Sequence, residues 1–279
     1  MTNKLILVGT DHDSIEYLTW QSLLMARASK KEIALGLEGV VRDESRESIY
    51  AGLMKLPKGF IFGIEHDLAN TYTDTLIGYG VHTVDDREQM PMLSVQLLNH
   101  LYESPTMQNA WEALREKKLH SCVRTFYDAI DRYKKSTASL ERRDILGGFM
   151  EITDMTTNNL PWRGLFYALS VEMTKEAHLL PKQDQPDFDA IDKYVTNPFL
   201  PSNQWKFADD VVVDWRDSFL EPNAKYVAKV AHENKVDAIV PVGAKHIETL
   251  GTKFGKTCRG LQVHIYSAMS DVPRVHWGI

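Results

Sequence analysis

Apolar residues in this chain form short continuous runs that alternate with amphipathic stretches of helical spacing. Residues 4–9, KLILVG, are one such run, typical of a strand buried on both faces. The alternation favours a parallel sheet with helices on its faces. The predicted strands are 4–9, 33–37 (IALGL), 60–64 (FIFGI) and 81–84 (VHTV), and the predicted helices between them are 14–29, 43–56 and 67–78, with Gly78 and Gly80 ending the third helix.

The middle of the chain has a different pattern. From residue 88 to about 180 the apolar spacing is helical with almost no strand signal, and residues 181–206 are rich in Pro, Asp and Asn, which predicts a loop. We therefore predict an α/β fold: a central, largely parallel sheet with flanking helices and a large helical insertion. The α/β core comprises residues 1–87 and 207–279, and the insertion, or lid, comprises 88–206. The closing elements are a helix at 222–234, a strand at 237–242 (DAIVPV), a helix at 246–254 and a strand at 261–266 (LQVHIY).

Polar residues gather where the predicted strands end. The first strand is followed by Gly9-Thr10-Asp11-His12, and the strand at 237–242 is followed by the same G-x-x-H pattern, Gly243-Ala244-Lys245-His246. Parallel sheets bind ligands beyond the carboxyl ends of their strands. We therefore expect these side chains to meet on one rim, with His12 and His246 close to a shared point. The other strand ends carry Glu38, Glu65, His66 and Asp85-Asp86-Arg87.

Histidine and carboxylate together suit a divalent metal such as Zn, Mn, Co or Fe, whose identity stays open. A catalytic metal needs about three protein ligands and a position for water. Each motif also has an ordinary structural interpretation, because Asp85-Asp86 or either histidine can cap a helix and glycine commonly forms a turn. Whether His66 belongs with the others stays open. The candidate metal ligands are His12, Glu38 and His246.

Composition narrows the functional classes. The net charge of −6 argues against general nucleic-acid binding, which needs a basic surface. Two cysteines without C-x-x-C spacing fit a reducing compartment, and no apolar run approaches the roughly 20 residues of a membrane helix. No signal peptide precedes the first strand, so a cytoplasmic protein is expected.

The paired motifs resemble those of the TraB/Tiki/PrgY group in the erythromycin-esterase and ChaN-like superfamily. The matching residues are Gly9 and His12, Glu38, the DDR sequence at 85–87, and Gly243 and His246. The resemblance also implies an arginine at the start of a helix before the closing strand, for which Arg216 is the candidate. It implies a metal-dependent peptidase or esterase, although the superfamily also contains a haem binder and regulators of peptide pheromones.

These observations predict a metal-dependent hydrolase acting on a small-molecule or peptide substrate. The metal would lower the pKa of a bound water toward ~7, Glu65 or Asp86 would act as general base, and Arg87 with Arg216 would bind substrate or stabilise the oxyanion. Two alternatives remain: a non-catalytic protein that binds a small molecule, haem or peptide, and a metal-free esterase in which a histidine is the general base. The sequence does not predict the oligomeric state.

Overall fold

The computed structural model describes residues 3–11, 14–81, 97, 100–101, 104–117, 128–132, 135–136, 144, 160–196 and 208–273. The chain divides into two compact units. The first combines residues 1–66 with 213–279, and the second comprises residues 67–212. Among the helices that are described, none is both long and apolar enough to cross a lipid bilayer.

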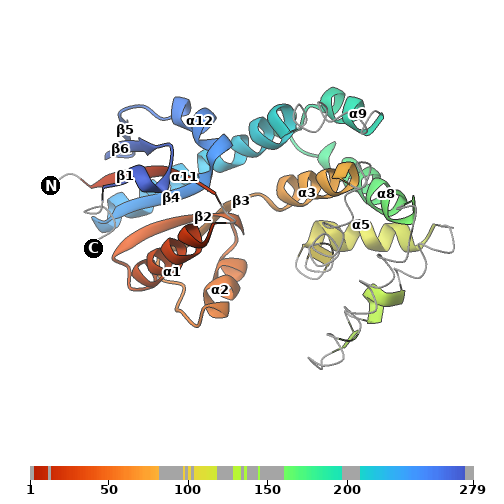
Figure 1. Cartoon of the computed structure of the whole chain (residues 1–279), viewed down its shortest axis with the longest axis horizontal. Helices are drawn as coiled ribbons and strands as arrows, with labels where there is room; N and C mark the ends of the chain where they lie inside the picture. Colours follow the sequence, from red (N-terminus) through yellow and green to blue (C-terminus); the bar gives the residue numbers. More distant parts are fainter. Residues whose placement is uncertain are drawn as a thin grey trace. The chain divides into compact units, whose positions relative to one another are not determined.

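The first unit is built on a six-stranded sheet in the order β3-β2-β4-β1-β6-β5 (Figure 1). Five strands are parallel, and only the short β5 pairs antiparallel, with β6. The predicted parallel strands at 4–9, 33–37 and 237–242 are thus confirmed in one sheet. The strands are β1 (Lys4–Thr10), β2 (Ile33–Val41), β3 (Ile61–Glu65), β4 (Asp237–Gly243), β5 (Thr257–Cys258) and β6 (Leu261–Tyr266).

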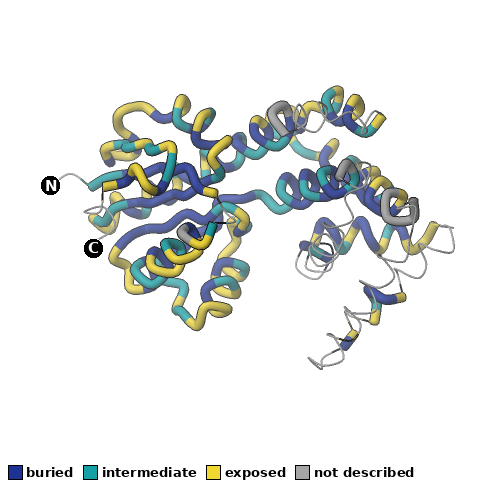
Figure 2. The backbone as a smooth tube through the Cα atoms, viewed as in Figure 1, coloured by how far each residue is buried: buried dark blue, intermediate teal, exposed yellow. Residues whose placement is uncertain are grey.

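Helices cover both faces of this sheet, which explains why the strands are apolar on both sides. Along β1, Ile6 and Val8 pack in one core, and Leu5 and Leu7 pack in the other. Figure 2 shows that β1, β2 and β4 are buried along most of their length. The first core lies under α1 (Ile15–Ser29) and α2 (Glu44–Leu53), and the second lies under α11 (Asp214–Asn234) and α12 (Ala244–Lys253).

The strands that carry the two G-x-x-H motifs are direct neighbours. In the β1–β4 pair, Gly9 lies opposite Val242 and Thr10 lies opposite Gly243. β1 continues into α1 and β4 continues into α12, and these helices pack on opposite faces of the sheet. The ends of β1 and β4 therefore form a topological switch point, where open α/β sheets bind ligands.

The described part of the second unit contains helices: α3 (Asp67–Val81), α5 (Pro105–Arg115), α8 (Leu160–Ala177), a short 3₁₀ helix (Lys182–Asp184) and α9 (Phe188–Thr196). Most of the helices predicted within 88–152 fall outside the described residues, so the insertion with its predicted limits stays a prediction. The strand predicted at 81–84 also falls outside the described residues, except for Val81, which is the last residue of α3.

Three sequence-based expectations are wrong, each because packing overrides a local signal. Gly78 does not end α3, because its missing side chain leaves room for the Phe166 ring, 2.9 Å from where a Cβ would lie. The predicted loop at 181–206 contains α9, whose buried Ile191 and Tyr194 supply an apolar face. α11 begins at Asp214, not at 222, so Pro222 lies inside the helix.

Candidate functional site at the carboxyl edge of the sheet

Four of the seven predicted site residues are described by the structure: Glu38, Glu65, Arg216 and His246. All four lie in the first unit and meet beyond the carboxyl ends of β2, β3 and β4. The remaining three, His12, Asp86 and Arg87, lie outside the described residues.

Glu38 joins three elements at this edge. It lies near the end of β2, where pairing with β3 shifts register, and the next residue, Gly39, has a φ of +79° that favours glycine. One carboxylate oxygen, Oε2, accepts the Gly243 backbone N–H at 2.5 Å. The other, Oε1, accepts from Arg216 Nη2 at 3.1 Å. The second motif is therefore fixed to β2 through this carboxylate.

Glu65 ends β3 and shares the same guanidinium. Arg216 Nη2 donates to Glu65 Oε2 as well as to Glu38. The side chain of Glu65 is almost fully buried. Burial raises the pKa of Glu65 and the nearby Glu38 raises it further, while the Arg216 charge opposes both effects. Glu65 therefore binds its proton more tightly than an ordinary glutamate does.

His246 lies in the first turns of α12 and is 4% exposed. Its Nδ1 lies 2.7 Å from Asp217 Oδ1, and its Nε2 lies 3.5 Å from Glu38 Oε1. The hydroxyl of Thr249 donates to the other oxygen of Asp217. His246 thus bonds to a neighbouring helix, so the helix-cap interpretation does not describe it.

Asp217 is a site residue that the sequence reasoning missed, although it directly follows Arg216. Its side chain is fully buried on α11. The buried positions along this helix include Leu220, Ala224 and Val227, at helical spacing. Asp217 falls on the same face one turn earlier. The sequence signal for Asp217 is an acidic residue within an apolar helical stripe. A carboxylate buried in this way needs a buried partner, which indicates a polar site.

We call Glu38, Glu65, Arg216, Asp217 and His246 the charged cluster. Its members' side chains are between 0% and 11% exposed. Three carboxyl groups face one permanent cation and one histidine. This excess of acidic groups in a buried place favours uptake of a proton or a cation.

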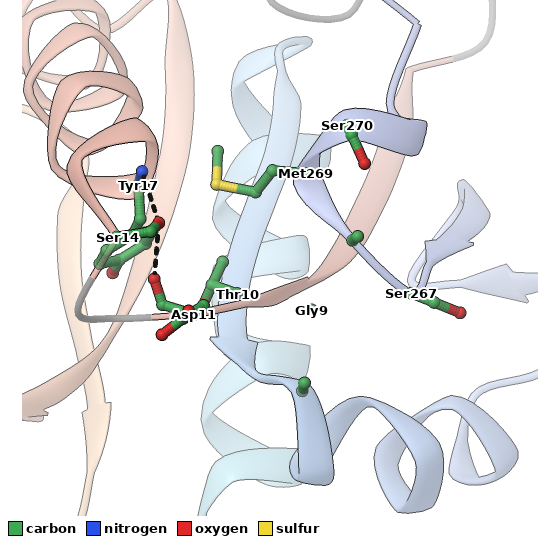
Figure 3. A pocket seen from close by; sticks show the side chains of 10 residues that line it. Gly9, Thr10, Asp11, Ser14, Tyr17, Ser267, Met269 and Ser270 are labelled. Atoms are coloured by element: carbon green, nitrogen blue, oxygen red, sulfur yellow. Dashed lines mark hydrogen bonds between the residues drawn. The ribbon is translucent and has the colours of Figure 1, made fainter.

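A pocket of about 310 Å³ opens beside this cluster, and we call it the strand-end pocket (Figure 3). The backbone of Ser267 passes so close to Gly9 that a Cβ there would lie 2.2 Å from its oxygen, which requires glycine. The Ser14 hydroxyl caps α1 by accepting from Tyr17 N and donates to Asp11 O (Figure 3). The lining residues are Gly9, Thr10, Asp11, Ser14, Tyr17, Ala244, Ser267, Ala268, Met269 and Ser270.

Tyr17 and Ala244 connect this pocket to the charged cluster. Burial raises the pKa of Tyr17, and the charges of Tyr50 and Glu38 raise it further, so the phenol stays protonated beside the carboxylate. Ala244 directly follows Gly243, whose N–H binds Glu38. The strand-end pocket therefore borders residues that adjoin or electrostatically influence Glu38, although Glu38 does not itself line it.

Among the residues that the structure describes, no group of three His, Cys, Asp or Glu side chains is arranged to hold a metal ion. Glu38 and His246 nevertheless fit as two ligands of one ion. Two ligands ~2.1 Å from a tetrahedral ion lie about 3.4 Å apart, and Nε2 and Oε1 are separated by 3.5 Å. Metal-ligating histidines commonly donate their other ring N–H to a carboxylate, the position that Asp217 occupies.

His66, left open by the sequence, stacks on Phe219 with ring centroids 4.1 Å apart.

Comparisons with protein-family models, curated proteins and solved structures give no match for this chain.

Proposed function

We propose that this chain is a metal-dependent hydrolase whose water-activating centre is built on Glu38 and His246. The observation that carries the proposal is the charged cluster at the carboxyl ends of β2, β3 and β4, next to the β1–β4 switch point. There Asp217 orients His246 from one side and Glu38 faces its Nε2 from the other. His12, three residues after Gly9 on the neighbouring strand, is the proposed third ligand. The family resemblance of the paired motifs agrees with this assignment.

The residues have separable roles in this proposal. Asp217 fixes the ring orientation of His246 by accepting from Nδ1, so that Nε2 faces Glu38. Arg216 holds Glu38 and Glu65 in place through one guanidinium nitrogen. Glu65, with its raised pKa, is suited to accept and return a proton. A divalent ion held by His12, Glu38 and His246 would supply Lewis acidity and a water that ionises near neutral pH.

The strand-end pocket is the proposed place for the substrate. Its volume of about 310 Å³ lies at the small end of the range for ligand pockets. Among the described residues, its lining combines hydroxyl groups with small apolar side chains, and Asp11 is the one carboxylate. This lining suits a neutral or cationic acyl compound, such as a small ester or a short peptide, and disfavours an anionic one.

A second candidate function is hydrolysis without metal, with His246 as the general base. The observation that favours it is the 2.7 Å contact between Nδ1 and Asp217, which is how a carboxylate orients a catalytic histidine. In this mechanism Nε2 would take the proton from water while Glu38 orients that water.

One experiment separates the two candidates. Protein purified without added metal is analysed for its elemental content and then assayed on a panel of nitrophenyl esters and short peptides, with and without chelator. The variants are Glu38→Gln and His246→Ala, with the exposed Glu248→Gln on α12 as the matched control. We expect bound metal and metal-restored activity in the wild type and control, and loss of both in the two variants.

Hydrolysis that survives chelation but needs His246 would replace the first candidate by the second. A protein that neither retains metal nor hydrolyses any member of the panel would contradict both.

A further inference from the structure

A second pocket, of about 340 Å³, lies where α12 ends. α12 begins at Ala244 beside the charged cluster and ends nine residues later at Lys253, roughly 14 Å away along the helix axis. We call this the basic pocket, because three of its seven lining residues are cations and none is a carboxylate. The lining residues are Lys225, Lys253, Phe254, Gly255, Thr257, Cys258 and Arg259.

The positive charge of the basic pocket is only partly neutralised. Lys225 forms an ion pair with Glu221, and its Nζ lies 5.6 Å from the centre of the Phe254 ring. Lys253 and Arg259 make no hydrogen bond or ion pair with any described residue. Two positive charges are therefore left over at one small pocket of a chain whose net charge is −6.

The backbone fixes Arg259 at the mouth of the basic pocket. β5 and β6 pair through Thr257 with Gln262 and Cys258 with Leu261, so Arg259 and Gly260 form a two-residue hairpin turn. Both have positive φ, 51° and 87°, which is the conformation of a type I′ turn. Such turns favour Asn, Asp or Gly, so Arg259 occupies a backbone conformation that its residue type disfavours.

The thiol of Cys258 does not supply the missing anion. Burial raises its pKa, although the charges of Lys225 and Arg259 act in the opposite direction. The thiol is therefore neutral near neutral pH, and the pocket stays positive.

From these charges and this shape, we propose that the basic pocket binds a small phosphate-bearing anion. The guanidinium of Arg259 matches two phosphate oxygens, the Lys253 and Lys225 ammonium groups supply point charges, and the Thr257 hydroxyl is a further donor. The volume of about 340 Å³ is that of a small-molecule site. This site is independent of the proposed hydrolase centre.

The test is calorimetric titration of the full-length protein with inorganic diphosphate, glycerol phosphate and citrate at one ionic strength. The variants are Arg259→Gly, which the positive φ accommodates, and Lys253→Gln. The control is Lys55→Gly, which removes an exposed lysine at a φ of 56° after α2, on the other face of the sheet. We expect diphosphate or glycerol phosphate to bind, and each pocket variant to weaken that binding about tenfold or more. The Lys55→Gly control should bind as the wild type does.

Three results would overturn the proposal: no binding of either phosphate compound, equal affinity for citrate, or equal losses in Lys55→Gly and Arg259→Gly. The His246→Ala variant locates the binding. If it binds diphosphate as the wild type does, the ligand is not held at the hydrolase centre, and if binding is lost there, the basic pocket is not the site. A preference between inorganic diphosphate and glycerol phosphate identifies the source of the phosphate group.

Discussion

Two groups of buried charges in the first unit differ in how well they are balanced. Glu47 on α2 is 3% exposed, and each of its oxygens has one partner. Oε1 accepts the Gly63 N–H at 3.0 Å, and Oε2 pairs with Lys58 Nζ at 2.6 Å. In the charged cluster, three carboxyl groups instead share one arginine and one histidine.

This contrast indicates which of the two groups stabilises the fold. A matched pair such as Glu47–Lys58 offsets its own desolvation and ties α2 to the loop before β3. An excess of buried carboxyl groups over cations, counted among the described residues, costs stability because the carboxyl groups share their counter-charges. Perturbed groups of this kind concentrate at functional sites. The imbalance, rather than burial alone, is our reason for proposing a function for the charged cluster.

The largest expected effect is on catalysis. His246→Ala should lower the hydrolytic rate about 10²- to 10⁴-fold, because it removes the group that we propose to act on the reacting water. Glu47→Gln should keep the wild-type rate per folded molecule, because Glu47 contacts only structural partners. Rates are measured on the best ester or peptide of the panel, with circular dichroism to confirm folding. Equal losses of hydrolytic rate in both variants would contradict the assignment of a catalytic role to the charged cluster and a structural role to Glu47.

The next effect is on stability. Here the substitution at Glu47 should have a larger effect than the substitution in the charged cluster. Glu47→Ala should lower the free energy of unfolding by about 3 kcal/mol, because Lys58 and the Gly63 N–H lose their partner. Glu38→Gln should change it by less than about 1 kcal/mol, because it removes one of the competing carboxylates around Arg216. Urea titration followed by tryptophan fluorescence measures both. A larger loss for Glu38→Gln would show that the charged cluster serves the fold.

A smaller effect is expected from Asp217→Asn, which changes a positioning residue. It should weaken metal affinity and activity about 10- to 100-fold, because the ring of His246 loses its charged acceptor. Metal titration separates this role from a structural one, since a merely structural residue would leave the affinity unchanged in folded protein. Asp214→Asn is the matched control, because Asp214 is exposed on the same helix.

Much of the first unit follows from the apolar pattern. The continuous runs at 4–9, 33–37 and 237–242 predict strands buried on both faces, because only such strands lack polar alternation. Helix limits were harder, since Pro222 resembles a helix start and Gly78 a helix end. Packing of α11 on the sheet and of α8 on Gly78 overrides both signals.

The residue pattern alone predicts the cluster members at or shortly after a strand end, and Arg216 is expected only through the family resemblance. Glu38 and His246 were proposed because parallel strands bring their carboxyl ends together. Asp217 is not predicted because it lies on a helix rather than at a strand end, and it reaches the cluster only through the docking of α11. Long-range helix docking leaves little local signal, and an acidic residue in an apolar stripe was the one trace of it.

The smallest expected effect is the pH dependence contributed by Glu65, which tests whether the charged cluster is overcrowded. Burial raises the folded-state pKa of Glu65 above its usual value near 4.5. The folded state therefore binds the proton more tightly than the unfolded chain. The resulting stability is fully present below pH 4.5 and is lost as the pH rises through the folded-state pKa.

Wild-type stability should fall across that window with a slope of at most about 1.4 kcal/mol per pH unit. Glu65→Gln should flatten this slope, whereas the exposed Glu248→Gln should follow the wild-type curve. Parallel curves for all three proteins would mean that Arg216 fully compensates Glu65 and that the cluster is as balanced as Glu47 with Lys58.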